Sequence, residues 1–207
     1  MTSYFRKLCD LLASIEVTEW DGTILSIDEG ARKAVGTILS VQSCSGKVMM
    51  IGNGGSAAIV SHMQNDLCKG VDVRAMVFNE IPLLTALAND HGYGCVFEQP
   101  IVLWAEAGDL LVAVSSSGQS ESILRAVRAG VERGCHVITL SGFSADNPLR
   151  RLGKVNFYVP SHIYGYVELV HSALTHFLTD CAMIQHPKKE GLSDRDVRTR
   201  IVSTIVH

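Results

Sequence analysis

One stretch decides the fold: Ile51-Gly52-Asn53-Gly54-Gly55-Ser56-Ala57. It ends a short apolar run that begins at Lys47, and it leads into residues 56–69, whose apolar positions have helical spacing. Glycines at such a turn let backbone amides approach a ligand closely, and the amides at a helix N-terminus favour an anion. The stretch therefore predicts a strand, a ligand-binding loop and a helix in succession.

The chain downstream repeats this alternation. Helical stretches are expected at 81–104, with a break near Gly92, and at 120–133 and 147–152. Strands that are apolar throughout and alternate with helices indicate a parallel sheet covered on both faces. The predicted fold is α/β, a doubly wound, five-stranded parallel sheet. Its strands are expected at Lys47 to Ile51, Arg74 to Phe78, Asp109 to Ser115, His136 to Ser141 and Val155 to Pro160.

Helices are also expected at both ends of the chain. Residues 2–16 and 24–43 have helical spacing, with Asp21 or Thr23 as a cap and Gly46 as a stop. A long helix is predicted over 165–184. His186 to Gly191 is then a polar linker, and Ser193 with Asp196 predicts a capping box that opens a short tail helix.

A second loop has the same design. Val114-Ser115-Ser116-Ser117-Gly118-Gln119-Ser120 follows the third predicted strand and opens a helix. Four hydroxyls and a helix N-terminus suit a phosphate monoester, which needs several donors at once. Neither loop contains Lys or Arg, so amides and hydroxyls would hold the phosphate. The simpler alternative is that Gly and Ser only build tight turns, but two such loops after parallel strands favour a ligand site.

A dinucleotide site is the rival interpretation of the first loop. Residues 52–57 fit G-x-G-x-x-A, a variant of the dinucleotide-binding pattern. That pattern expects an acidic residue at the end of the next strand, and Glu80 lies a little beyond it. A serine-rich loop after a later strand is no part of the pattern. We therefore expect no nucleotide cofactor, and a Rossmann-type oxidoreductase is the third hypothesis.

The amino-acid composition limits the classes of partner that we expect. The 207 residues include 18 basic and 21 acidic ones, which gives a net charge of -3 and no basic stripe for nucleic acid. No apolar run has the roughly 18 residues of a membrane span, and the first thirty residues lack the pattern of a secretion signal. Six scattered cysteines without a CxxC pair indicate reduced thiols. We expect a cytoplasmic protein with no nucleic-acid or membrane partner.

Four motifs in order resemble the SIS (sugar isomerase) domain of bacterial phosphoheptose isomerases. They are residues 52–58, Ala88-Asn89-Asp90, residues 115–120, and a helix with Glu168, His171 and His176. The similarity runs from about residue 4 to 184. It implies isomerisation of sedoheptulose 7-phosphate to a heptose 7-phosphate through an enediol, for surface-polysaccharide synthesis. It also implies a homotetramer with active sites shared between subunits, and zinc in some members.

The resemblance also assigns roles to residues. Asp66 would be the catalytic base and His176 the acid, a division of work that a carboxylate and an imidazole can perform at neutral pH. Three domains follow: N-terminal oligomerisation helices (1–45), an SIS sugar-phosphate domain (46–185), and a linker with a short C-terminal helix (186–207). The aligned metal ligands are His62, Asp66, Glu168 and His176; the substrate-binding set is Asn53, Gly54, Gly55, Ser56, Asn89, Asp90, Ser115, Ser116, Ser117, Ser120 and Glu168.

The chain departs from the family pattern at several of these positions. Asp66 replaces a glutamate, Glu168 replaces an amide, and Cys68-Lys69-Gly70 replaces Thr-Gly-Arg. These departures leave open a non-catalytic SIS protein, either a phosphosugar-binding regulator or an adaptor. An adaptor would not need Asp66 and His176 together, so their joint presence favours the enzyme.

Overall fold

The structure is a computed structural model, and it describes residues 2–186. Its described part contains one seven-stranded sheet in the order β2-β1-β7-β6-β5-β3-β4. Five of these strands are parallel, and β1 and β2 run antiparallel at one edge. The strands are β1 (Glu16–Glu19), β2 (Ile24–Leu25), β3 (Val48–Gly52), β4 (Ala75–Val77), β5 (Leu110–Ser115), β6 (His136–Ser141) and β7 (Val155–Tyr158).

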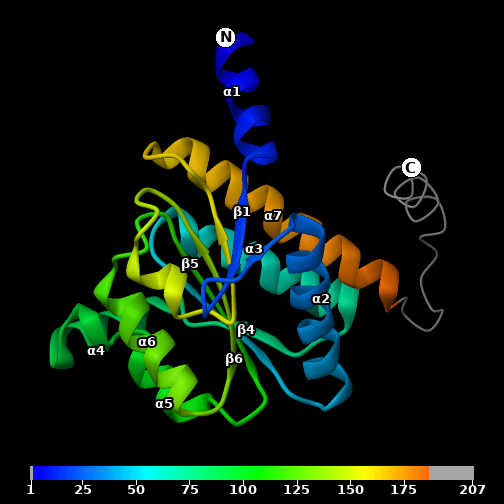
Figure 1. The fold of residues 1–207 in the computed structure, drawn as a ribbon. Helices are drawn as coiled ribbons and strands as arrows, with labels where there is room; N and C mark the ends of the chain where they lie inside the picture. Colours follow the sequence, from blue (N-terminus) through cyan, green and yellow to red (C-terminus); the bar gives the residue numbers. More distant parts are fainter. Residues whose placement is uncertain (1, 187–207) are drawn as a thin grey trace.

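Helices cover both faces of the sheet (Figure 1). One face packs against α2 (Ile27–Ser43), α3 (Gly55–Asp66) and α7 (Tyr164–Gln185), and it forms the larger apolar core. The other face packs against α5 (Glu98–Trp104) and α6 (Glu121–Glu132), with α4 (Ile81–His91) at its margin. Alternate residues of β3 and β5 enter the two cores, as expected for strands buried on both sides. The doubly wound architecture is confirmed.

The parallel strands fix where the two loops lie. Gly52, at the end of β3, is paired with Val114 of β5. Ser115, at the end of β5, is paired with Ser141 of β6. Both loops therefore leave neighbouring strands at the carboxyl edge of the sheet, where ligands bind in folds of this class.

The hairpin β1–β2 was missed by the sequence analysis, which expected five strands and helix up to residue 16. Val17 and Thr18 are β-branched and buried, and β1 pairs with the free edge of β7. The turn that follows contains Asp21 and Gly22, with Gly22 at a φ of +88°. Asp-Gly is a strong hairpin signal, and the helical periodicity on either side obscured it.

The start of α2 also differs from the prediction. Neither Asp21 nor Thr23 caps it; the cap is Ser26, whose hydroxyl accepts from the backbone N–H of Glu29. The Glu29 carboxylate in turn accepts from the N–H of Ser26, which completes a capping box. The helix begins three residues later than expected because residues 24 and 25 belong to β2.

Two other predicted helical stretches, 56–69 and 147–152, differ from the prediction. The helix expected over 56–69 ends at Asp66 and continues as a π-helical turn, η1 (Leu67–Val71). The expected break near Gly92 is present, followed by a 3-10 turn, η2 (Tyr93–Cys95). The stretch at 147–152 is a second 3-10 turn, η3 (Pro148–Arg151). The predicted capping box of Ser193 and Asp196 lies outside the described residues.

The N-terminal helix α1 (Thr2–Ala13) projects from the body above the start of α7 (Figure 1). Leu11 is its one fully buried residue. Tyr4 stacks on Tyr166 of α7 with 4.5 Å between ring centroids. None of the helices in the described range has the length and hydrophobicity that a membrane crossing needs.

His171 anchors α7 to the sheet edge from which the loops leave. It is fully buried, and its Nε2–H donates to the carbonyl oxygen of Ser141 at 3.1 Å. The other ring nitrogen, Nδ1, is buried without a hydrogen-bond partner. Burial lowers the pKa of His171 from 6.5 to about 4, so the ring is neutral at pH 7.

This buried histidine predicts a loss of stability in acid. Because its folded pKa lies below the unfolded one, stability falls as the pH drops from about 6.5 to about 4, by roughly 3 kcal/mol. His171→Gln, which keeps a donor for Ser141, should lose this part of the pH dependence in urea unfolding at pH 7 and pH 4. His91→Gln, an exposed control, should not. An equal loss of unfolding stability between pH 7 and pH 4 in wild type and in His171→Gln would contradict this assignment.

Candidate active site

The first loop turns directly from β3 into α3. Gly54 has a φ of +54°, a left-handed conformation that favours glycine. Gly52 is required by space, because a Cβ there would lie 2.6 Å from the backbone carbon of Ser56. The N–H of Ser56 donates to the carbonyl of Asn53, so the loop closes on itself. The backbone amides at the start of α3 receive no side-chain cap.

The second loop is held more rigidly. Gly118 has a φ of +62°, and a Cβ there would collide with the side chain of Asn147. Asn147 is buried, and its amide donates to the carbonyls of Gly142 and Ser144 at 3.2 and 2.8 Å. Ser115 Oγ accepts from the N–H of Gly118. The loop is therefore fixed from beneath by a buried amide that the sequence analysis did not single out.

Two hydroxyls of this loop have no partner within it. Ser116 Oγ is buried and forms no hydrogen bond among the described residues. Ser120 is the N-cap of α6, but its side chain makes no capping bond. A buried polar group without a partner costs free energy. These two hydroxyls are therefore free to donate hydrogen bonds to a bound anion.

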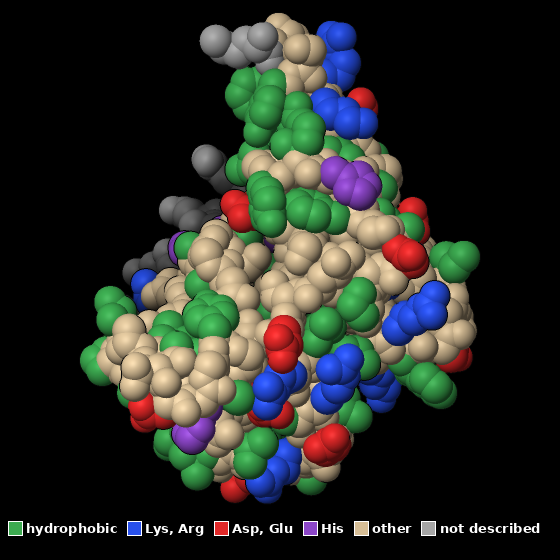
Figure 2. Space-filling view, turned by 90° about the vertical axis from the view of Figure 1, so that its left-hand side faces the viewer, with side chains coloured by type: hydrophobic (Ala, Val, Ile, Leu, Met, Phe, Trp, Pro, Cys, Tyr) green, Lys and Arg blue, Asp and Glu red, His purple; other side chains and the backbone are tan. Residues whose placement is uncertain are grey.

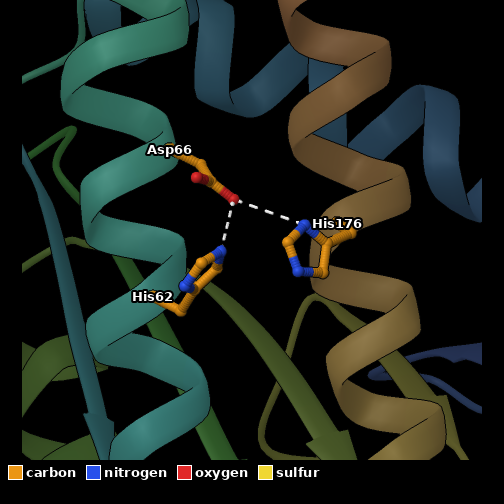
Figure 3. Close-up of side chains that lie close together, drawn as sticks. All are labelled: His62, Asp66 and His176. Atoms are coloured by element: carbon orange, nitrogen blue, oxygen red, sulfur yellow. Dashed lines mark ion pairs between the residues drawn. The ribbon is translucent and has the colours of Figure 1, made fainter.

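A cluster of three side chains lies between α3 and α7. Figure 3 shows the Asp66 carboxylate facing the rings of both His62 and His176, which lie beside each other. One carboxylate oxygen, Asp66 Oδ2, lies 3.5 Å from His62 Nε2 and 3.4 Å from His176 Nδ1. The Asp66 side chain is 19% exposed, whereas the two imidazoles are about half exposed. The ligand atoms of all three lie within 4.8 Å of one another.

Glu168 does not join this cluster. Its carboxylate lies against the first turn of α3, where a Cβ on Gly55 would be 2.5 Å from Glu168 Oε2. Glu168 and His176 are separated by eight residues of one continuous helix, a rise of about 12 Å. The structure therefore brings together three of the four predicted metal ligands and places the fourth beside the first loop.

Asn89 and Asp90 lie in the last turn of α4, where the amide of Asn89 donates to Asp90 at 2.8 Å. The link from this region to the first loop is made by Tyr93, which the sequence analysis missed. The Tyr93 hydroxyl donates to Asn53 Oδ1 at 2.7 Å, and the Asn53 amide donates to Ser122 of α6 at 3.1 Å. Both ends of the Asn53 side chain are thereby fixed. A single tyrosine after a helix carries no sequence signal for such a role.

Asp180 is a second residue that the sequence analysis missed. It lies one turn beyond His176 on α7, the spacing that places two side chains on the same helix face. Partial burial raises the pKa of Asp180; the charge of His176 opposes this shift and that of Asp66 adds to it. The cluster therefore has a second carboxylate in its electrostatic surroundings.

The family model of the SIS domain matches residues 3–142, about two thirds of the chain. The chain belongs to the SIS domain family. The match covers the first loop, α3 with His62 and Asp66, and the serine loop. The SIS fold, the recognition of the family and the parallel sheet are thus confirmed by an independent comparison.

Similar proteins are named phosphoheptose isomerases. One from Syntrophotalea carbinolica is 29% identical over 86% of this chain and 89% of its own length. Another, from Shewanella denitrificans, is 31% identical over 75% and 81%. Among solved structures, phosphoheptose isomerase GmhA from Neisseria gonorrhoeae is 32% identical, with a TM-score of 0.70 over 74% of this chain and 86% of that one.

Proposed function

We propose that this SIS protein is an aldose-ketose isomerase that converts sedoheptulose 7-phosphate to a heptose 7-phosphate. The observation that carries the proposal is the Asp66 carboxylate held between two imidazoles, in a chain similar to phosphoheptose isomerases. The heptose would serve surface-polysaccharide synthesis. Six unpaired cysteines agree with a cytoplasmic enzyme.

Two of the three side chains, Asp66 and His176, divide the proton transfers of an enediol mechanism. Asp66 accepts the proton from the carbon beside the carbonyl and returns it to the neighbouring carbon. His176 donates a proton to the carbonyl oxygen and takes one from the adjacent hydroxyl, so the enediol forms and collapses without net proton loss. Asp66 Oδ2 lies 3.4 Å from His176 Nδ1, which brings the proposed base and the proposed acid to the same part of the site.

The same cluster fits a divalent metal such as zinc. Two imidazoles and a carboxylate are typical zinc ligands, and three protein ligands leave a position for substrate. His62, Asp66 and His176 would hold the ion; Glu168 is proposed to contact the substrate rather than the metal. When bound, the metal would polarise the substrate oxygens.

The distances favour a site shared between subunits. Asp66 lies eleven helical residues beyond Gly55, a rise of about 16 Å from the first loop. We take this rise as too long for one heptose phosphate to reach from the cluster to the first loop of its own subunit. We propose that the cluster of one subunit faces the loops of another, in a homotetramer.

The exposed apolar surface supports this assembly. Figure 2 shows hydrophobic side chains gathered on α1 and continuing onto the body directly below it. Tyr4, Phe5, Ile163 and Tyr164 are all exposed. A projecting helix with one buried residue gains little from its own subunit, since packing supplies most helical stability. Of the predicted N-terminal segment 1–45, α1 is therefore proposed to serve oligomerisation, whereas α2 packs on the sheet of the proposed sugar-phosphate domain, residues 46–185.

No observation on the described residues specifically favours the non-catalytic alternatives, a phosphosugar-binding regulator or an adaptor. Phosphosugar binding alone would require the loops, but not a partly buried carboxylate between two imidazoles on different helices. The dinucleotide hypothesis is further weakened by the second loop, whose unpartnered hydroxyls suit a single phosphate group. The isomerase accounts for both features.

Asp66→Asn should abolish interconversion of sedoheptulose 7-phosphate and its aldose, assayed with and without zinc, because an amide cannot accept the substrate proton. The fold should stay intact, since the amide is isosteric. Asp180→Asn is the matched control: it removes a nearby carboxylate outside the cluster and should keep most of the rate. Retained isomerisation in Asp66→Asn would remove the base from the proposal.

Sedoheptulose 7-phosphate should raise the melting temperature, whereas sedoheptulose should not, because the serine loop offers donors for a phosphate. Ser116→Ala should weaken the phosphosugar about 10- to 100-fold, the effect of one lost hydrogen bond to a charged group. Its own stability should change little, since Ser116 Oγ has no partner to lose. Ser43→Ala, at the distant end of α2, is the control. Equal stabilisation by the free sugar would exclude the phosphate site.

A further inference from the structure

A groove lies at the amino ends of β6 and β7, the edge of the sheet opposite to the two loops. Its volume is about 510 Å³, within the range of small-molecule sites. The last two turns of α6 form one wall, and η3 with the start of β7 forms another. Trp20, in the turn after β1, completes it. We call it the amino-edge groove; its lining residues used below are Trp20, Arg128, Val131, Glu132, Arg151 and Lys154.

The lining of the amino-edge groove carries a positive charge, whereas the chain as a whole is negative. Arg128, Arg151 and Lys154 line it, with Glu132 as the one carboxylate among the described lining residues. None of the three cations forms an ion pair within residues 2–186. The chain as a whole has a net charge of -3, so this local excess of positive charge is specific to the groove. It attracts anions, and arginines suit phosphate oxygens.

The groove also has an apolar side. Trp20 is 67% exposed and Val131 is 52% exposed, although both line a concave surface. An exposed indole in a hollow offers a large flat face for stacking, and nearby arginines add donors at its rim. A second hollow of about 370 Å³ shares His136, Val137 and Lys154 and extends the groove toward α2. In that second hollow Lys33 pairs with Glu19 at 2.7 Å, and Arg32 adds a further cation beyond the amino-edge groove.

We propose that the amino-edge groove binds an anion that carries a flat aromatic group, as a nucleoside diphosphate does. The aromatic group would stack on Trp20 and pack against Val131. Arg128, Arg151 and Lys154 would contact the phosphates. This site is distinct from the phosphosugar site, because it lies at the opposite edge of the sheet, and it does not rest on the isomerase proposal.

The fluorescence of Trp20 can report ligand binding in the groove directly. The chain has two tryptophans, so Trp104→Phe leaves Trp20 as the single indole fluorophore. In this variant, ADP should quench the fluorescence saturably, whereas adenosine should bind at least about tenfold more weakly, because it lacks the charge-assisted contacts. Pyrophosphate, measured by competition, should also be weaker than ADP. Pyrophosphate binding as tight as ADP would exclude the aromatic contact.

Two charge reversals, one on α6 and one at its C-cap, test the basic residues. Arg128→Glu should weaken ADP binding at least about tenfold, the effect of losing one charge-assisted contact. Arg133→Glu is the control: it makes the same charge change five residues farther along the chain, outside the lining of the groove, and should leave ADP binding unchanged. Equal weakening by both, or no saturable quenching by ADP in the parent variant, would overturn the proposal.

A final experiment distinguishes ADP binding in this groove from ADP binding at the serine loop. Ser116→Ala should not alter ADP binding, and excess sedoheptulose 7-phosphate should not displace ADP. Displacement would place ADP in the loops and contradict the second site. Failure of isomerisation in the assays above would leave this result unaffected.

Discussion

The close packing of α3 on α7 is the constraint on which the rest of the site depends. Two glycines lie along this contact. Gly55, in the first turn of α3, lies against the Glu168 carboxylate, and Gly70, in the π-helical turn after α3, lies against the end of the Met183 side chain. A Cβ at either position would require the facing side chain to move. The two helices run in the same direction, so Gly55 meets Glu168 at one end and Asp66 meets His176 farther along. This alignment sets both the catalytic cluster and its distance from the loops.

That distance links catalysis to assembly. Under the proposed shared site, Asp66, which lies about 16 Å along α3 from its own first loop, would act on a substrate held by the loops of another subunit. The projecting α1 and the exposed apolar residues around the start of α7 then have a function beyond stability. They would bring the cluster of one subunit to the phosphate-binding loop of another. Symmetric assembly would complete every site at once.

Much of this could be predicted from the sequence, because the relevant signals are local. The five parallel strands were found from apolar runs, and both loops from glycines and serines directly after them. His62 and Asp66 were assigned from the family resemblance, and their spacing of four residues is compatible with one helix face. The β1–β2 hairpin was missed because Val17 and Thr18 are stabilised by the edge of β7, a contact made 140 residues away. Tyr93 and Glu168 likewise lie against residues that are far away in the sequence, Asn53 and Gly55, so no local pattern records these contacts. The hydrogen bonds of Asn147 are local, but its contact with Gly118 of the serine loop is not.

Subunit complementation tests the central claim most directly. Asp66→Asn disables the cluster. Ser120→Asp keeps a good N-cap for α6 and places a negative charge against the phosphate, so it disables the loop. Each variant alone should be inactive. If sites combine a cluster and a loop from different subunits, equal mixing by co-refolding should restore isomerisation to about a quarter of the wild-type rate, since each half-site is intact in half of the subunits. Mixed oligomers that stay inactive would contradict the shared site and place the cluster and the loop of one subunit in the same site.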